Sequence, residues 1–208
     1  MIGHGGISQV RKRAESGVSL LEVVISMAVL TVGMVSMLGV FGLAMASTQT
    51  SQQSLIAKQL ANEAYESIVT ARNTGQITWD DIQNTGSSNC PISGASTCGI
   101  FADPTTPQPM YQAITTGSYA GILGTTYDVN QPEQTLQDPG TDGIYYTPDD
   151  VLIPLTGYKR TVLIGQVTDA TGNVLASLRS VTITVQYSTP QTNTPKTYIL
   201  NSYISQYQ

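Results

Sequence analysis

One uncharged stretch near the N-terminus constrains this chain more than any other feature. From Val23 to Ala46 the sequence contains no Asp, Glu, Lys, Arg or His. A helix of about 20 apolar residues crosses the hydrocarbon core of a bilayer, so this stretch is long enough to span a membrane. Arg11, Lys12 and Arg13 precede it, and basic flanks stay in the cytoplasm. The sequence therefore predicts a single membrane helix with a cytoplasmic N-terminus.

A cleaved secretory signal is the alternative explanation of this stretch. Signal peptides have an apolar core of about 7–15 residues that ends at a cleavage site of small residues. The stretch here is longer, and only Ala44–Ala46 weakly resembles such a site. Length therefore favours a membrane helix.

The helical pattern continues beyond the apolar stretch. Small and apolar residues recur at helical spacing on one face: Ala57, Leu60, Ala61, Ala64, Tyr65, Ile68 and Ala71. No Pro occurs between Val18 and Arg72, and Gly75 can take the left-handed conformation that ends a helix. The sequence predicts one continuous helix with an apolar first half and an amphipathic second half.

Glu22 stands beside the apolar stretch, where a carboxylate is costly. The surrounding segment, SGVSLLEVVISMAVLTVGM, closely resembles the class III signal of type IV prepilins. That signal has a basic leader ending in Gly, here Gly17, and a Glu at the fifth position after it, counted here from Val18. The segment is particularly similar to PilV-type minor pilins (type IV pilus modification proteins) and to minor pseudopilins of type II secretion. The resemblance covers roughly residues 11–72. Val18 stands where many members have Phe, and the span lacks the Pro of many major pilins.

The resemblance implies a mechanism of maturation and assembly. A prepilin peptidase would cut between Gly17 and Val18 and N-methylate the new amino group. The mature chain would then leave the inner membrane and join other pilin subunits through its apolar helix. Glu22 would pair with the amino group of Val18 on its own or a neighbouring helix. The simpler alternative is that Glu22 only lies at the level of the lipid headgroups.

The resemblance to type IV prepilins predicts that the chain has four parts. Residues 1–17 are a cytoplasmic leader, 18–46 the membrane and assembly half of the helix, and 47–75 its amphipathic half. Residues 76–208 form an extracytoplasmic, β-rich domain. The predicted fold class is α+β, a pilin fold in which the long helix packs on a C-terminal antiparallel sheet. The protein is expected in the inner membrane and then in the periplasm or the pilus fibre.

The sequence of the C-terminal part predicts an antiparallel meander. Strands are predicted at about Tyr158–Val167 and Val174–Tyr187, joined by a turn at DATGN. A third strand is predicted in KTYILNSYISQY after the Pro-containing turn STPQTNTPK. A shorter strand is predicted at Thr126–Asn130, and residues 84–125 are expected to be rich in loops. One face of the meander would pack on the amphipathic half of the helix.

The chain has two cysteines, Cys90 and Cys98. Outside the cytoplasm a short disulfide loop is expected. Two free thiols are the alternative, while zinc is disfavoured because no histidine lies nearby to complete four ligands.

The acidic loop DPGTDGIYYTPDD has spacing typical of calcium loops. Asp138, Asp142 and Asp149 fall at positions 1, 5 and 12 of the EF-hand pattern, and Ile144 would offer its backbone carbonyl at position 7. Asp150 is a further candidate ligand. The sequence therefore predicts Ca²⁺ as a possible ligand of a loop without flanking helices, with a solvated acidic turn as the alternative.

No catalytic role is predicted. The only histidine, His4, lies in the predicted leader, so the mature chain lacks a Ser–His or Cys–His pair. The net charge of −5 gives no reason to expect direct nucleic-acid binding. The predicted function is a minor type IV pilin that primes or modifies pilus assembly for adhesion, motility or DNA uptake. A type II secretion minor pseudopilin and a membrane-anchored calcium-binding surface module are the alternatives.

Overall fold

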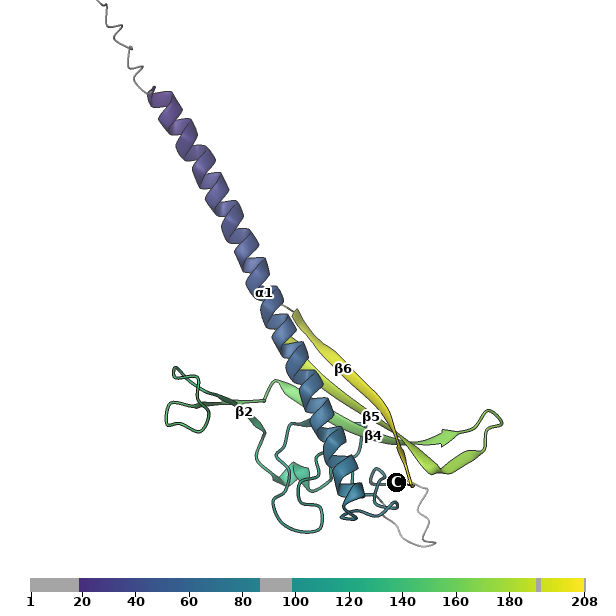
Figure 1. Cartoon of the computed structure of the whole chain (residues 1–208). Coiled ribbons are helices and arrows are strands. Elements are labelled where there is room, and N and C mark those ends of the chain that lie inside the picture. Colours follow the sequence, from purple (N-terminus) through teal and green to yellow (C-terminus); the bar gives the residue numbers. More distant parts are fainter. Residues whose placement is uncertain (1–18, 87–98, 190–191, 208) are drawn as a thin grey trace, which may run out of the picture. The chain divides into compact units, whose positions relative to one another are not determined.

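The computed structural model describes residues 19–86, 99–189 and 192–207 (Figure 1). The chain forms two compact units, Met1–Met45 and Ala46–Gln208. The helix α1, Leu20–Asn73, contributes its first half to one unit and its second half to the other.

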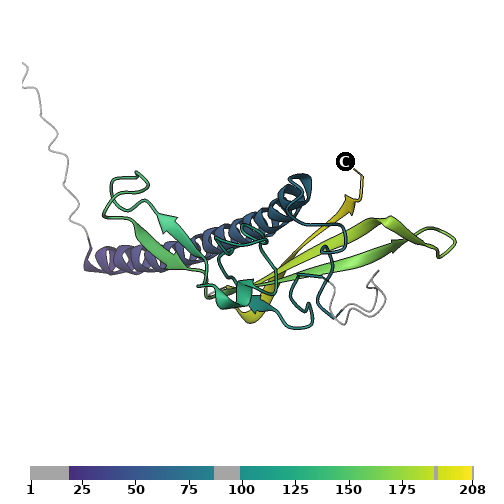
Figure 2. The ribbon, with the colours of Figure 1, turned by 90° about the horizontal axis from the view of Figure 1, so that it is seen from below.

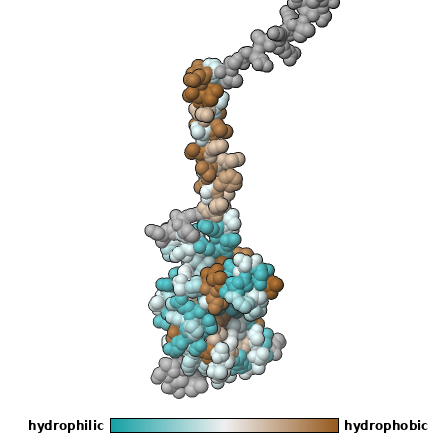
Figure 3. Space-filling model, turned by 90° about the vertical axis from the view of Figure 1, so that its left-hand side faces the viewer, coloured by the Kyte–Doolittle hydropathy of each residue, from teal (hydrophilic) through white to brown (hydrophobic). Residues whose placement is uncertain are grey.

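The described part of the first unit is apolar helix. The backbone N–H groups of Glu22 and Val23 donate to the carbonyl of Ser19, and α1 begins at Leu20. Its large apolar side chains are exposed at successive positions and so on every side of the helix. The face seen in Figure 3 is largely brown. This helix is long and apolar enough to cross a membrane. An apolar surface on all sides is the composition of a helix that lies in lipid or packs against other apolar helices.

In the second unit, α1 is amphipathic as predicted. Its buried residues are Ala57, Leu60, Ala61, Ala64, Ile68 and Ala71, and Tyr65 is half-buried. Gly75 takes a φ of 70° just after the helix, and the N–H of Gln76 donates to the carbonyl of Ala71. The predicted left-handed stop at Gly75 is confirmed.

A four-stranded antiparallel sheet packs against this half of the helix. Its order is β1–β4–β5–β6, from β1 (Gln108–Pro109), β4 (Tyr158–Thr168), β5 (Val174–Thr189) and β6 (Thr192–Ser205). The inward positions of β5, which include Val181, Ile183 and Val185, belong to the same core cluster as Ala61 and Ala64 of α1. The alanines let the helix lie close to the sheet. The predicted α+β, pilin-like architecture is confirmed.

A second, two-stranded sheet projects from the body of this unit as a hairpin (Figures 1 and 2). It pairs β2 (Thr135–Asp138) with β3 (Val151–Pro154), so the acidic loop is the connection of this hairpin. The sequence does not predict these two strands, because TLQD and VLIP are short and neither alternates apolar and polar residues over enough positions.

Two predicted features are wrong. The segment predicted as a strand at Thr126–Asn130 contains a 3₁₀ helix, η1 (Asp128–Asn130), because the backbone turns at Thr125, whose carbonyl accepts from the N–H of Asp128. The segment read as a long Pro-containing turn is largely strand: β5 ends at Thr189 and β6 starts at Thr192. Pro195 is tolerated because β6 is an edge strand.

Candidate functional site

The predicted cleavage site lies outside the described residues, but Glu22 lies within them. Gly17 and Val18 both precede Ser19, the first residue that the structure describes. Glu22 is exposed in the first turn of α1, and the hydroxyl of Ser26 donates to its backbone carbonyl over 2.7 Å. A carboxylate in the first turn is stabilised by the positive end of the helix dipole, by about 0.3–1 kcal/mol. The dipole alone therefore accounts for only a small part of the cost of a carboxylate beside an apolar stretch.

The part of α1 that follows Glu22 exposes a largely apolar surface. Its exposed side chains include Leu30, Val35, Leu38 and Leu43. Burying one such side chain fully contributes about 1.5–3 kcal/mol. Lipid or other apolar helices can therefore bind along the whole of this segment.

The acidic loop forms a network of internal hydrogen bonds. Asp149 accepts from the backbone N–H and the hydroxyl of Thr141, each over 3.0 Å, and from the hydroxyl of Thr147 over 2.8 Å. These bonds lower the pKa of Asp149 to about 2, with the Thr147 hydroxyl contributing most. Asp150 accepts from the N–H of Tyr146, from Thr147 and from Gln137.

The other two acids of the loop each bond only locally. Asp138 accepts from the N–H of Gly140, and Asp142 from the N–H of Ile144. Thus Asp149 and Asp150 are brought together around Thr147, while Asp138 and Asp142 are not part of that network. In the part of the chain that the structure describes, no three acidic, His or Cys side chains are grouped to hold a metal. Calcium binding therefore stays a prediction.

The predicted disulfide cannot be placed. Cys90 and Cys98 both lie in the segment 87–98, outside the described residues. Their pairing stays a prediction as well.

The second unit contains a buried ion pair that the sequence pattern did not predict. Arg160 on β4 and Asp128 in η1 are both buried, with 3.5 Å between Nη2 and Oδ2. The N–H of Gly124 also donates to Asp128. They line a small cavity of about 20 Å³ together with Thr125 and Tyr111. Burial outweighs the attraction of Arg160 and raises the pKa of Asp128 to about 6.

One sequence signal could have revealed this pair. Arg160 alternates in phase with Tyr158 and Val162, so a strand that buries Val162 also turns Arg160 toward the core. A buried guanidinium needs an acidic partner. Asp128 could not have been named from the sequence, because its loop is not periodic.

A second arginine fixes the chain that follows α1. The guanidinium of Arg179 on β5 lies 4.4 Å from the ring centre of Trp79 and donates to the carbonyls of Trp79 and Ile82. The indole N–H of Trp79 donates to the carbonyl of Ala176 over 3.0 Å. These contacts of Arg179 and Trp79 attach the segment that follows α1 to the sheet, so their role is structural.

Comparison with known proteins identifies the N-terminal segment. Residues 12–38 match the family model of the prokaryotic N-terminal methylation motif. No curated protein and no solved structure matches the chain. The matched residues contain Gly17, Val18, Glu22 and much of the apolar stretch. The motif supports a type IV prepilin-like protein, and such motifs imply processing by prepilin peptidase and assembly with other pilins.

Proposed function

We propose that this chain is a minor subunit of a type IV pilus, made as a precursor and cleaved between Gly17 and Val18. One observation carries the proposal: the matched segment 12–38 joins a basic leader, Gly17 and Glu22 to a helix whose apolar side chains are exposed. This combination serves a chain that first sits in a membrane and then packs its helix against other subunits. The role is structural rather than catalytic.

The assignment to a minor, PilV-type subunit rests on the sequence. Val18 replaces the Phe of many members, and the span lacks a Pro. Such a subunit would prime or modify pilus assembly and so support adhesion, motility or DNA uptake. A minor pseudopilin of type II secretion would share the same N-terminus. Neighbouring genes for a pilus or for a secretion system distinguish the two.

Each residue of the proposed site has a distinct role. Gly17 leaves no side chain in the protease subsite, and cutting after it creates the amino group of Val18. Glu22 then supplies the opposite charge, on the same helix or on the next. Apolar surroundings make an unpaired carboxylate strongly unfavourable, so the pair would fix the stagger of neighbouring helices.

Cleavage is tested with Gly17→Ala in the full chain expressed with its prepilin peptidase. The added methyl group should block the cut, so intact-mass analysis should show the leader retained. The wild type should begin at Val18 and carry one methyl group. Gly33→Ala is the matched control, because nothing lies within 4 Å of a Cβ at Gly33. Normal cleavage of Gly17→Ala would contradict the proposal.

Glu22 is tested by its effect on assembly. Removing one partner of a buried ion pair costs about 3–5 kcal/mol. Glu22→Ala should therefore be cleaved normally but enter sheared fibres at least about a hundredfold less than the wild type. Glu66→Ala, at an exposed position of the same helix, is the control. Equal incorporation of Glu22→Ala and wild type would rule the pairing out.

A further inference from the structure

The hairpin β2–β3 exposes several large apolar and aromatic side chains. All four residues of β3, Val151–Pro154, are exposed. The loop adds Ile144, Tyr145 and Tyr146, and Tyr146 is 90% exposed. A lone two-stranded hairpin is only marginally stable in water, and packing against another surface stabilises it. Surface of this kind marks an interaction site.

The charge of this hairpin limits what can bind it. Its acids are Asp138, Asp142, Asp149 and Asp150, and no Lys, Arg or His occurs from residue 73 to residue 158. The partner surface should therefore combine apolar or aromatic groups with positive charge.

The second unit carries a surface with that chemistry. A groove of about 430 Å³ lies where α1 meets β5 and β6, and it is lined by Leu55 and Lys58 of the helix and by Tyr187, Lys196 and Tyr198 of the strands. Leu55 is 67% exposed and both lysines are exposed. No acidic residue lines the groove, and neither lysine forms an ion pair with another described residue.

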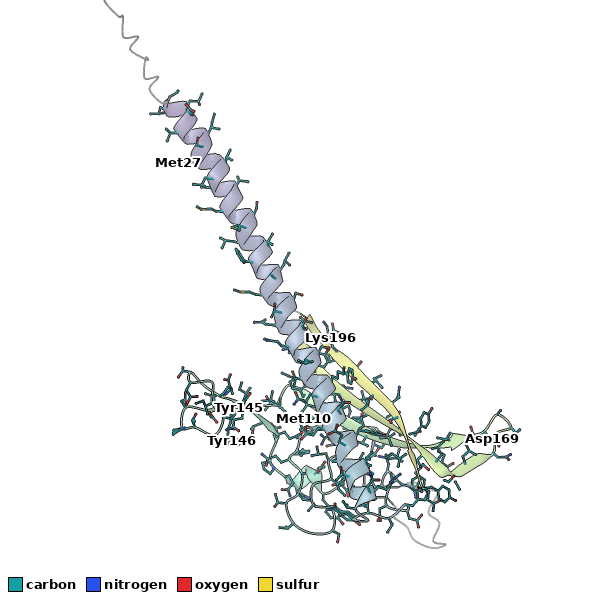
Figure 4. All side chains as sticks on the ribbon, in the orientation of Figure 1. Met27, Met110, Tyr145, Tyr146, Asp169 and Lys196 are labelled. Carbon is teal, nitrogen blue, oxygen red and sulfur yellow. The ribbon has the colours of Figure 1, made fainter. Side chains whose placement is uncertain are left out.

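In this structure the hairpin does not lie on the groove of its own chain (Figure 4). Figure 4 shows Tyr145 and Tyr146 on one side of α1 and Lys196 on the other, within the same unit. A contact between the two surfaces as they lie here would therefore join different molecules. Because different surfaces meet, a pair keeps one hairpin and one groove free, so such contacts repeat into closed rings or open helices.

We propose that the β2–β3 hairpin of one copy docks into the groove of Lys58 and Lys196 on a second copy. The acids of the hairpin loop face the two lysines, and the apolar side chains of the hairpin cover Leu55 and the tyrosines. The inference goes beyond the proposed function, because it adds a contact between two copies of this chain.

The contact is tested in the full chain in its native membrane, with a chelator present to exclude calcium. A photo-crosslinking phenylalanine analogue replaces Tyr146, and irradiation should give an adduct of two copies. Peptide mapping should place the link between residues 50 and 58 or between 187 and 198. The analogue at Tyr207, which is exposed outside the hairpin, should give no such adduct.

Charge variants show whether the groove is responsible. The double variant Lys58→Glu with Lys196→Glu should lower the adduct yield by about tenfold, since it puts like charges face to face. Asp142→Lys alone should lower the adduct yield. Combined with Lys58→Glu and Lys196→Glu, Asp142→Lys should restore part of the adduct yield that the double variant lost. Lys159→Glu is the matched control, because Lys159 is exposed on the opposite face of the sheet and does not line the groove.

Three outcomes overturn the proposal: no adduct, an adduct only with a different protein, or equal yields for the double variant and Lys159→Glu. Removal of the leader is scored on the same samples. Cleaved chains without the adduct contradict the docking alone, whereas uncleaved chains contradict the proposed function.

Discussion

At position 128 a carboxylate lies in the protein core against a single guanidinium. The pKa of Asp128 is raised from 3.8 to about 6, mainly by burial, with Arg160 acting in the opposite direction. Between these two pH values the folded chain holds a proton that the unfolded chain has released. Folding is therefore favoured by acid in this window, and that stability is lost as the pH rises through about 6.

This residue predicts how stability depends on pH. Lowering the pH from 7 to 5 should increase the free energy of unfolding of the detergent-solubilised chain, by about 1.4 kcal/mol. Denaturant titrations at the two pH values measure it. Asp128→Asn should remove this increase, whatever its effect at a single pH.

Asp103→Asn is the control for that measurement. Asp103 lines the same cavity, but hydrogen bonds from Thr105 lower its pKa. Its variant should keep the wild-type dependence on pH. A free energy that decreases from pH 7 to pH 5, or an unchanged dependence in Asp128→Asn, would contradict the assignment.

At the scale of elements, two proposals concern the β2–β3 hairpin: its docking into a second copy and the binding of calcium by its loop. Calcium binding by its loop remains a proposal from the sequence. In the described structure the carboxylates of this loop bond to Thr141, Thr147 and nearby backbone N–H groups. An ion would have to replace some of these bonds with carboxylate and carbonyl ligands, because Ca²⁺ takes six to eight oxygens.

The calcium proposal is tested by calorimetric titration of the full chain. If the loop binds Ca²⁺, titration should give saturable heat at up to about millimolar concentration. Asp142→Ala should weaken the binding about tenfold or more, because it removes a proposed ligand. Asp80→Ala, an exposed acid outside the loop, should bind as the wild type does. Absence of heat, or equal binding by Asp142→Ala, would refute the proposal.

At the scale of the whole molecule, one chain carries two units with opposite surface chemistry. Along Leu20–Met45 the exposed large side chains other than Glu22 are apolar, whereas the second unit buries its own core and exposes many polar groups. The first unit thus requires lipid or other apolar helices to cover it. The candidate membrane span and the methylation motif agree with membrane anchoring and a pilus-associated location.

Membrane anchoring gives a prediction for the apolar unit. An Asp at the centre of a spanning helix costs about 2.5–3.5 kcal/mol. Val32→Asp should therefore reduce the fraction of the chain that stays with membranes after alkaline extraction, while Gln52→Asp, in the second unit, should not. Equal retention of both variants would show that the segment is not held in the bilayer core.

The sequence by itself determined the features that depend on local pattern. The apolar stretch, the amphipathic face around Ala61 and Ala64, and the paired strands β4 and β5 follow from periodicity, because a side chain's face depends only on its spacing along a helix or strand. The glycine stop at Gly75 follows from backbone sterics. The methylation motif is contiguous, so its residues could be compared directly with known proteins.

Only the tertiary structure decided the contacts between distant segments. The pairing of Asp128 with Arg160, the hold of Arg179 on Trp79, and the groove between α1, β5 and β6 each join residues far apart in the chain. The turn of the backbone into η1 likewise replaced a predicted strand. Such features arise when separate elements pack and leave polar groups to be satisfied, and no local spacing encodes which segments will meet.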